Sequence, residues 1–130
     1  MVGHAIMELI AVNGSDTRRI NHALKVLGFA RAIAEAEGLS GDALAVVELA
    51  AVLHDIAIRC CEEKYGAAGG RLQEKEGPAI ALPILQRCGA SDAVAQRVAY
   101  IIAHHHTYDA IDGLDYRIIV EADFLVNRDE

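Results

Sequence analysis

Histidine and aspartate side chains interrupt several otherwise apolar stretches of this chain. His22 lies beside an apolar stripe, and His54 and Asp55 follow an apolar run. Asp123 breaks another apolar stretch, and three consecutive histidines occupy positions 104–106. Because a buried polar group without a partner costs free energy, we expect these side chains to converge. Imidazoles and carboxylates together are ligands for Mn, Fe, Co, Ni or Zn, and for Mg where carboxylates and water dominate.

The elements that must position these residues are predicted to be helices. Apolar residues recur at three- and four-residue steps from Thr17 to Glu37, after an expected N-cap at Asp16. The segment from about Asp42 to Ile58 is apolar nearly all round, which places it at the centre of the domain. Further helices are expected over Gly3–Val12, from Pro78 to about Cys88, from Asp92 to about His105, and from Asp115 to about Asn127. The predicted fold is an all-α, compact bundle of five to six helices, in which facing helices supply the ligands.

Two connections are candidates for substrate selection. Cys60–Gly77 contains several glycines and many charged residues, so a long loop is predicted there, of the kind that often acts as a lid. Pro78 then suits the first turn of the following helix. A shorter polar link is expected over Thr107–Gly113.

Composition excludes several classes of protein. The 130 residues fit one domain, 1–130, and 53% hydrophobic residues with only 5% aromatic ones favour helices over a β-sandwich. A net charge of −7 excludes a broad basic surface for nucleic acid. No apolar run approaches the length of a membrane span. Three cysteines, two of them adjacent, make a poor disulfide framework, so we expect a cytoplasmic protein.

The order of these residues resembles a known family. His22, then His54-Asp55, then Asp123 is similar to the H…HD…D signature of the HD-domain metal-dependent phosphohydrolases. The flanks agree, with Asp16-x-x-Arg19 before His22, Leu53 before the pair, Ile101-Ile102-x-x-His105, and Glu121-Ala122 before Asp123. The resemblance runs from about Asp16 to Asn127. It implies the all-helical HD bundle and one divalent ion held by His22, His54, Asp55 and Asp123.

The resemblance also implies roles in catalysis. Asp55 both ligates the ion and holds the attacking water. His105 contacts the substrate phosphate or a second metal, His104 ranks next as a substrate contact, and His106 is expected to be exposed. No histidine lies between His54 and His104, so a single ion is the expectation, although Glu74 or Glu76 could complete a second metal site.

Three basic residues are candidates for binding an anionic substrate. Arg19 precedes His22 by one turn and shares its helical face. It can serve as a phosphate clamp, as a partner of a ligand carboxylate, or as a surface partner of Asp16. Arg59 and Lys64 follow the His54-Asp55 pair and could meet a phosphate there.

The leading interpretation is a phosphohydrolase that cleaves a phosphomonoester or phosphodiester, such as a nucleotide, with metal-activated water. The alternative is a non-catalytic HD-like module that binds a nucleotide or a protein partner, although a degenerate member would more often have lost a ligand. A purely structural metal is a third interpretation, and it predicts unfolding on chelation. The expected partner is a small phosphorylated molecule, and a small aliphatic helical domain often forms a homodimer.

Overall fold

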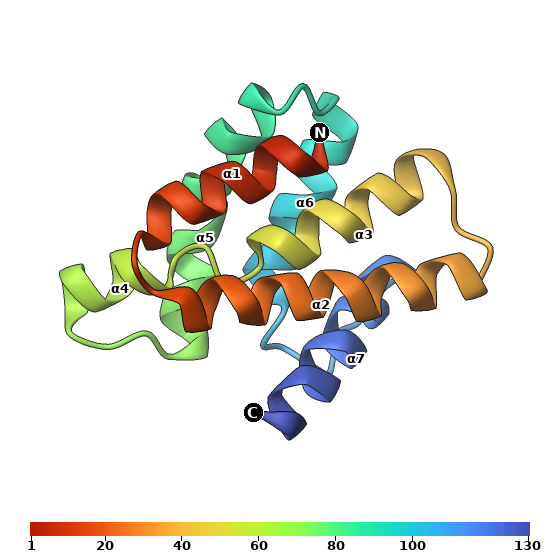
Figure 1. Ribbon diagram of the computed structural model, residues 1–130. Coiled ribbons are helices and arrows are strands. Elements are labelled where there is room, and N and C mark those ends of the chain that lie inside the picture. The colour runs from red at the N-terminus through yellow and green to blue at the C-terminus, as the bar shows by residue number, and fades with distance from the viewer.

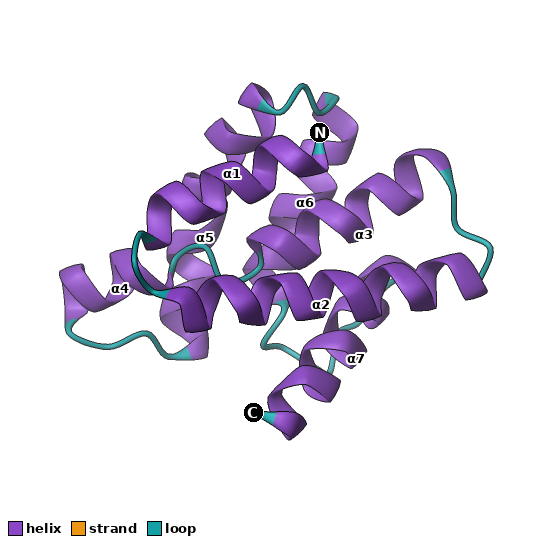
Figure 2. Ribbon diagram, in the orientation of Figure 1, coloured by secondary structure: helices purple, strands orange, loops and turns teal.

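The computed structural model describes residues 1–130, except for the side chain of Asp129. Seven helices make up the chain, and no strand is found among the described residues (Figures 1 and 2). They are α1 (Val2–Asn13), α2 (Thr17–Ala36), α3 (Gly41–Leu53), α4 (Ile58–Tyr65), α5 (Gly70–Arg87), α6 (Asp92–His104) and α7 (Leu114–Asp129). The all-α prediction is confirmed, with one helix more than the five to six expected.

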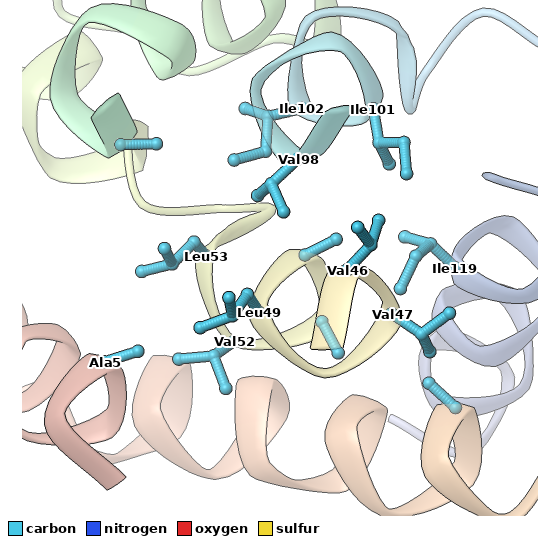
Figure 3. Packing of buried hydrophobic residues seen from close by; sticks show 14 of the residues in the cluster. Ala5, Val46, Val47, Leu49, Val52, Leu53, Val98, Ile101, Ile102 and Ile119 are labelled. Carbon is cyan, nitrogen blue, oxygen red and sulfur yellow. The ribbon is translucent and has the colours of Figure 1, made fainter. Parts of the chain in front are cut away.

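Helix α3 is the centre of the bundle, as its apolar sequence predicted. It packs against α1, α2, α6 and α7 (Figure 1). Figure 3 shows Val46 and Val47 of α3 beside Ile119 of α7, and Ala5 of α1 on the side of Val52. Burial of these aliphatic side chains supplies the main driving force for folding. No described helix is both long enough and apolar enough to cross a membrane.

Two helices begin at a side-chain cap, and the cap at Asp16 is expected from the sequence. The Asp16 carboxylate accepts a hydrogen bond from the backbone N–H of Arg19 at 3.3 Å, and α2 begins at Thr17. The Ser91 hydroxyl accepts one from the N–H of Val94 at 3.2 Å, and α6 begins at Asp92. Each cap satisfies a backbone donor that has no partner within the helix.

The end of α3 differs from the prediction. The helix ends at Leu53 rather than at about Ile58, and a hydrogen-bonded turn occupies positions 54–57. In this turn the N–H of Ile56 donates to the Leu53 carbonyl, and the N–H of Ile58 donates to the Asp55 carbonyl, both at 3.1 Å. The turn lets the chain change direction into α4 while His54 and Asp55 stay at the end of the central helix.

The long loop predicted over Cys60–Gly77 is wrong. Most of this segment is helical, since α4 continues to Tyr65 and α5 begins at Gly70, which leaves only positions 66–69 as a connection. Pro78 consequently lies inside α5 rather than at its start. The cost of the missing N–H is offset by packing, because α5 buries residues such as Ala81 and Leu85 against the core.

Close packing of α5 accounts for two of the glycines that suggested a loop. A Cβ atom added to Gly77 would clash with Cγ2 of Ile102 on α6. A Cβ atom added to Gly70 would lie 2.9 Å from Cβ of His106, just beyond α6. These glycines therefore allow α5 to lie close to α6 and to the histidines that follow it.

Candidate metal centre

Four predicted ligands converge from three parts of the chain. His22 extends from α2, His54 and Asp55 lie in the turn after α3, and Asp123 extends from α7. The Nε2 atom of His22 lies 3.0 Å from Oδ1 of Asp123 and 3.3 Å from Oδ2 of Asp55. One ligand atom from each of the four residues lies within 4.8 Å of the others. Two imidazole nitrogens and two carboxylate oxygens in this arrangement suit a divalent transition metal.

His54 is oriented as a metal ligand. Its Nδ1 atom donates to the backbone carbonyl of Ala51 at 2.7 Å, so Nε2 is the nitrogen that faces the cluster and would bind a metal ion in place of a proton. This Nε2 atom is buried and has no hydrogen bond among the described residues, although Asp55 and Asp123 oxygens each lie 3.3 Å away. A buried imidazole nitrogen that faces two carboxylates without a hydrogen bond fits the coordination of a cation.

Charge within the cluster controls its protonation. Hydrogen bonds to Asp123 and Asp55 raise the pKa of His22 to about 10. Burial alone would raise the pKa of Asp55, but the charge of His54 and the hydrogen bonds from histidine hold it well below its usual value. The carboxylates are therefore ionised at neutral pH, and protons on the histidines balance them. A bound divalent ion would replace those protons, so metal binding should release protons to solvent.

A second group shares one carboxylate with the first. It consists of Asp55, His105 and His106. The Oδ1 atom of Asp55 lies 3.4 Å from Nε2 of His105, whereas Oδ2 faces His22 and His54. His105 is oriented as His54 is, with Nδ1 donating to the Ile102 carbonyl at 2.8 Å and Nε2 buried without a hydrogen bond among the described residues. Asp55 thus contacts both groups.

A family model for the HD domain matches residues 19–127. The match covers most of the chain and includes the four candidate ligands and His105. The chain belongs to the HD-domain family. This superfamily consists in general of metal-dependent phosphohydrolases, and HD domains bind divalent metals. No match was found among curated proteins or among solved structures.

The three consecutive histidines have different surroundings in this HD domain. His104 lies in the last turn of α6, where its ring stacks on Tyr100 at 4.2 Å and its Nδ1 donates to the Tyr100 carbonyl at 2.8 Å. His104 is therefore not brought to the cluster. The expectation that His106 is exposed is wrong, because it is half-buried with its ring 4.0 Å from that of His105. Its backbone N–H donates to Glu74 at 3.1 Å, which draws this turn against α5.

The three basic candidates also separate. Arg19 lines a polar cavity of about 660 Å³ that reaches His22, Asp55 and Asp123. Its guanidinium is paired with Asp16 at 3.1 Å and with Glu62 of α4 at 3.2 Å. Arg19 therefore forms the surface pair with Asp16 and also lies beside the HD centre.

Arg59 and Lys64 are directed elsewhere on the surface. Arg59 pairs with Glu63 at 3.2 Å and donates to the Val12 carbonyl at 3.3 Å. Lys64 pairs with Glu76 at 2.9 Å. Neither lines the polar cavity, so the structure does not bring these two candidates to the HD centre.

Two residues at the centre had no signal in the sequence. Glu130 lies beyond the last predicted helix, yet its carboxylate is 2.8 Å from Nδ1 of His22. Gln73 falls in the segment that was predicted to be a loop, but it is buried and lies 3.4 Å from Nε2 of His106. Both contacts join residues that are far apart in the sequence, so the spacing of residues along the chain does not predict them.

Proposed function

We propose that residues 1–130 form an HD-type phosphohydrolase that uses water and one divalent ion to cleave a phosphomonoester or phosphodiester. His22, His54, Asp55 and Asp123 would hold the ion. The observation that carries the proposal is the Nε2 atom of His54, which is buried, lacks a hydrogen bond among the described residues and lies 3.3 Å from two carboxylates. A cation would satisfy this nitrogen and both carboxylates together.

A bound divalent ion supplies positive charge near the phosphate and lowers the pKa of water in its open positions. The protein would supply orientation. Oδ1 of Asp55, which faces away from His22 and His54, can accept a hydrogen bond from the attacking water. Because Nδ1 of His105 is held by Ile102, its Nε2 is left to take up a proton and donate it to a phosphate oxygen.

The reaction is hydrolysis of an ester bond. The water oxygen bonds to phosphorus, the bond between phosphorus and the ester oxygen breaks, and the released alcohol takes up a proton from water. Arg19 and Arg18 both line the polar cavity and would bind the phosphate oxygens. In that role, Arg19 would exchange its exposed partner Glu62 for phosphate.

The test compares hydrolysis and metal content in the same preparations. Protein stripped by a chelator is reloaded with Mn²⁺ or Ni²⁺ and assayed with p-nitrophenyl phosphate and with bis-p-nitrophenyl phosphate. We expect metal-dependent release of p-nitrophenol, and loss of both bound metal and activity in His54→Ala. His4→Ala is the matched control, because His4 lies on α1 in an exposed pair with Glu8.

Circular dichroism distinguishes loss of the site from loss of the fold. Should His54→Ala fail to fold, Asp123→Asn replaces it, because the amide keeps the size of the side chain. Absence of divalent metal from the reloaded wild-type protein would refute the proposal. Stoichiometric metal without hydrolysis of either ester would favour the alternative, a binding module that is not an enzyme.

A further inference from the structure

Three large apolar side chains near the HD centre are exposed without contributing to the core. Phe124 and Tyr108 are 67% and 62% exposed, and Leu125 is 38% exposed. All three line one hollow of about 710 Å³, together with Val120. Exposed apolar side chains that gather around one hollow often mark a binding site.

This hollow is continuous with the metal centre. His105 and Asp123 also line it, and Asp123 lines the polar cavity as well. Asp123 and Phe124 follow Val120 by three and four residues on α7, so each is a neighbour of Val120 on the helix surface. A molecule held by Asp123 through a cation would therefore have Val120 and Phe124 within its reach.

The hollow and the polar cavity differ in the side chains that line them. The polar cavity contains two arginines, Arg18 and Arg19, and four carboxylates, Asp16, Asp55, Asp123 and Glu130. No lysine or arginine lines the hollow in the described part of the chain, and its charged residues are Glu121 and Asp123. Arginine donors for phosphate oxygens are therefore present in the cavity and not in the hollow, where the apolar lining favours an uncharged group.

We propose that the hollow binds a planar aromatic group carried by the alcohol part of the phosphate ester. This proposal rests on the proposed function, and it narrows the substrate to esters with an aromatic ring. Phe124 and Tyr108 offer exposed rings for stacking, while Val120 and Leu125 supply an aliphatic wall. A volume of about 710 Å³ accommodates a bicyclic ring.

The direct test uses 1-naphthol, the dephosphorylated product of 1-naphthyl phosphate. The chain has no tryptophan, so naphthol fluorescence can be followed during titration with little interference from the protein. We expect saturable binding to the metal-loaded protein, weakened about 3- to 10-fold by Phe124→Ser through loss of ring stacking. The matched control is Phe29→Ser on α2, a phenylalanine that is 44% exposed and does not line the hollow.

Hydrolysis gives a second readout. Phe124→Ser should raise KM for 1-naphthyl phosphate about 3- to 10-fold relative to KM for glycerol phosphate, which has no ring to stack. Equal effects of Phe124→Ser and Phe29→Ser, or no saturable naphthol binding by the wild-type protein, would overturn the proposal. Because naphthol carries no phosphate, its binding is measured without hydrolysis, and failure of the proposed function would leave this measurement intact.

Self-association is the competing use of the same surface. Light scattering of the wild-type and Phe124→Ser proteins measures it directly. A dimer that Phe124→Ser dissociates, in a protein that does not bind naphthol, would assign the hollow to a second copy of the chain and overturn the proposal. A protein whose association state is the same with and without Phe124→Ser, and which binds naphthol, would support it.

Discussion

Helix α7 contributes to two charged clusters that differ in how well they satisfy themselves. Near its start, Asp115 joins Asp112 in binding Arg97, and all three side-chain nitrogens of Arg97 donate to these carboxylates at 2.7–3.2 Å. Further along, Asp123 joins the candidate metal centre, where Nε2 of His54 and Nε2 of His105 have no hydrogen bond in the described part of the chain. The cluster around Arg97, here called the closed cluster, needs no further partner. The candidate metal centre, here called the open cluster, has ring nitrogens that are unpaired among the described residues and can bind a cation.

Under the proposed function, the charges of the Arg97 cluster stabilise the fold, whereas those of the open cluster serve metal binding. A buried polar group normally has a hydrogen-bond partner in the folded protein. Buried ring nitrogens without one therefore indicate a functional role, such as binding an ion. The Arg97 cluster fastens the link before α7 to α6, and Gly113 allows it, because a Cβ atom there would lie 2.8 Å from Nη2 of Arg97. We therefore expect substitutions in the two clusters to affect different properties.

The largest effect is expected from Asp55→Asn. Asp55 faces both histidine groups, so under the proposed function its charge would contribute to metal binding and would hold the attacking water. We expect kcat/KM for an aryl phosphate to fall at least about 100-fold, with retention of the helical circular dichroism spectrum. Metal content by mass spectrometry and initial rates check this. A variant with wild-type kcat/KM would show that the open cluster is not the catalytic one.

Asp115→Asn should affect stability instead. It removes the charge that accepts two hydrogen bonds from Arg97, so we expect the free energy of unfolding in urea to fall by about 2 kcal/mol. Metal content and kcat/KM of the folded protein should remain at wild-type values. Arg31→Met is the control, since the Arg31–Glu35 pair is exposed and should contribute less than about 0.5 kcal/mol. Loss of metal in Asp115→Asn would erase the distinction between the clusters.

The open cluster was easier to anticipate from sequence than the closed one. His22, His54, Asp55 and Asp123 attracted attention because each interrupts an apolar stretch, and their order matches a family signature. Arg97 gave no such signal, since an arginine on an amphipathic helix is usually exposed. Arg97 pairs with Asp112 and Asp115 because the link after α6 folds back beside it, which is a property of the tertiary structure.

The ranking of the histidines shows where helical geometry stops being a guide. Consecutive helical residues point about 100° apart, so at most one or two of the three histidines were expected on the metal's side of a helix that continued to about His105. However, α6 ends at His104, and His105 and His106 lie in the turn that comes after the helix. That boundary brings His106 beside His105 and leaves His104 on Tyr100. An error of one residue in the predicted helix end was enough to change the expected neighbours.

A smaller effect within the open cluster is expected from Glu130. Its carboxylate lies 2.8 Å from Nδ1 of His22, so in the metal-bound state it would orient the ring and fix the proton on Nδ1. Glu130→Ala should weaken Mn²⁺ affinity about tenfold in a calorimetric titration. Glu130→Gln, whose amide oxygen still accepts a hydrogen bond, should stay within about threefold of the wild type. Equal affinities of Glu130→Ala and the wild-type protein would assign this contact no role in metal binding.

The smallest effect concerns the acid stability of the closed cluster. Burial raises the pKa of Asp115, but hydrogen bonds from Arg97 and from the N–H of Tyr116 outweigh it and lower the pKa below the usual value. Hydrogen bonds from Arg97 also lower the pKa of Asp112. A carboxyl whose pKa is lower in the folded state stabilises the protein above its unfolded pKa, and this stabilisation is lost as the pH falls through the folded value.

Urea unfolding of the wild-type and Asp115→Asn proteins between pH 6 and about pH 3 isolates this contribution. Asp55 and Asp123 also have lowered pKa values, so the stability of both proteins should fall with acid. The difference between the two proteins should nevertheless shrink below about pH 4, where the unfolded chain of the wild type takes up a proton at position 115 that the variant cannot bind. A constant difference over this range would mean that Asp115 stabilises the fold through its shape and not through its charge, and the closed cluster would then owe its strength to Asp112.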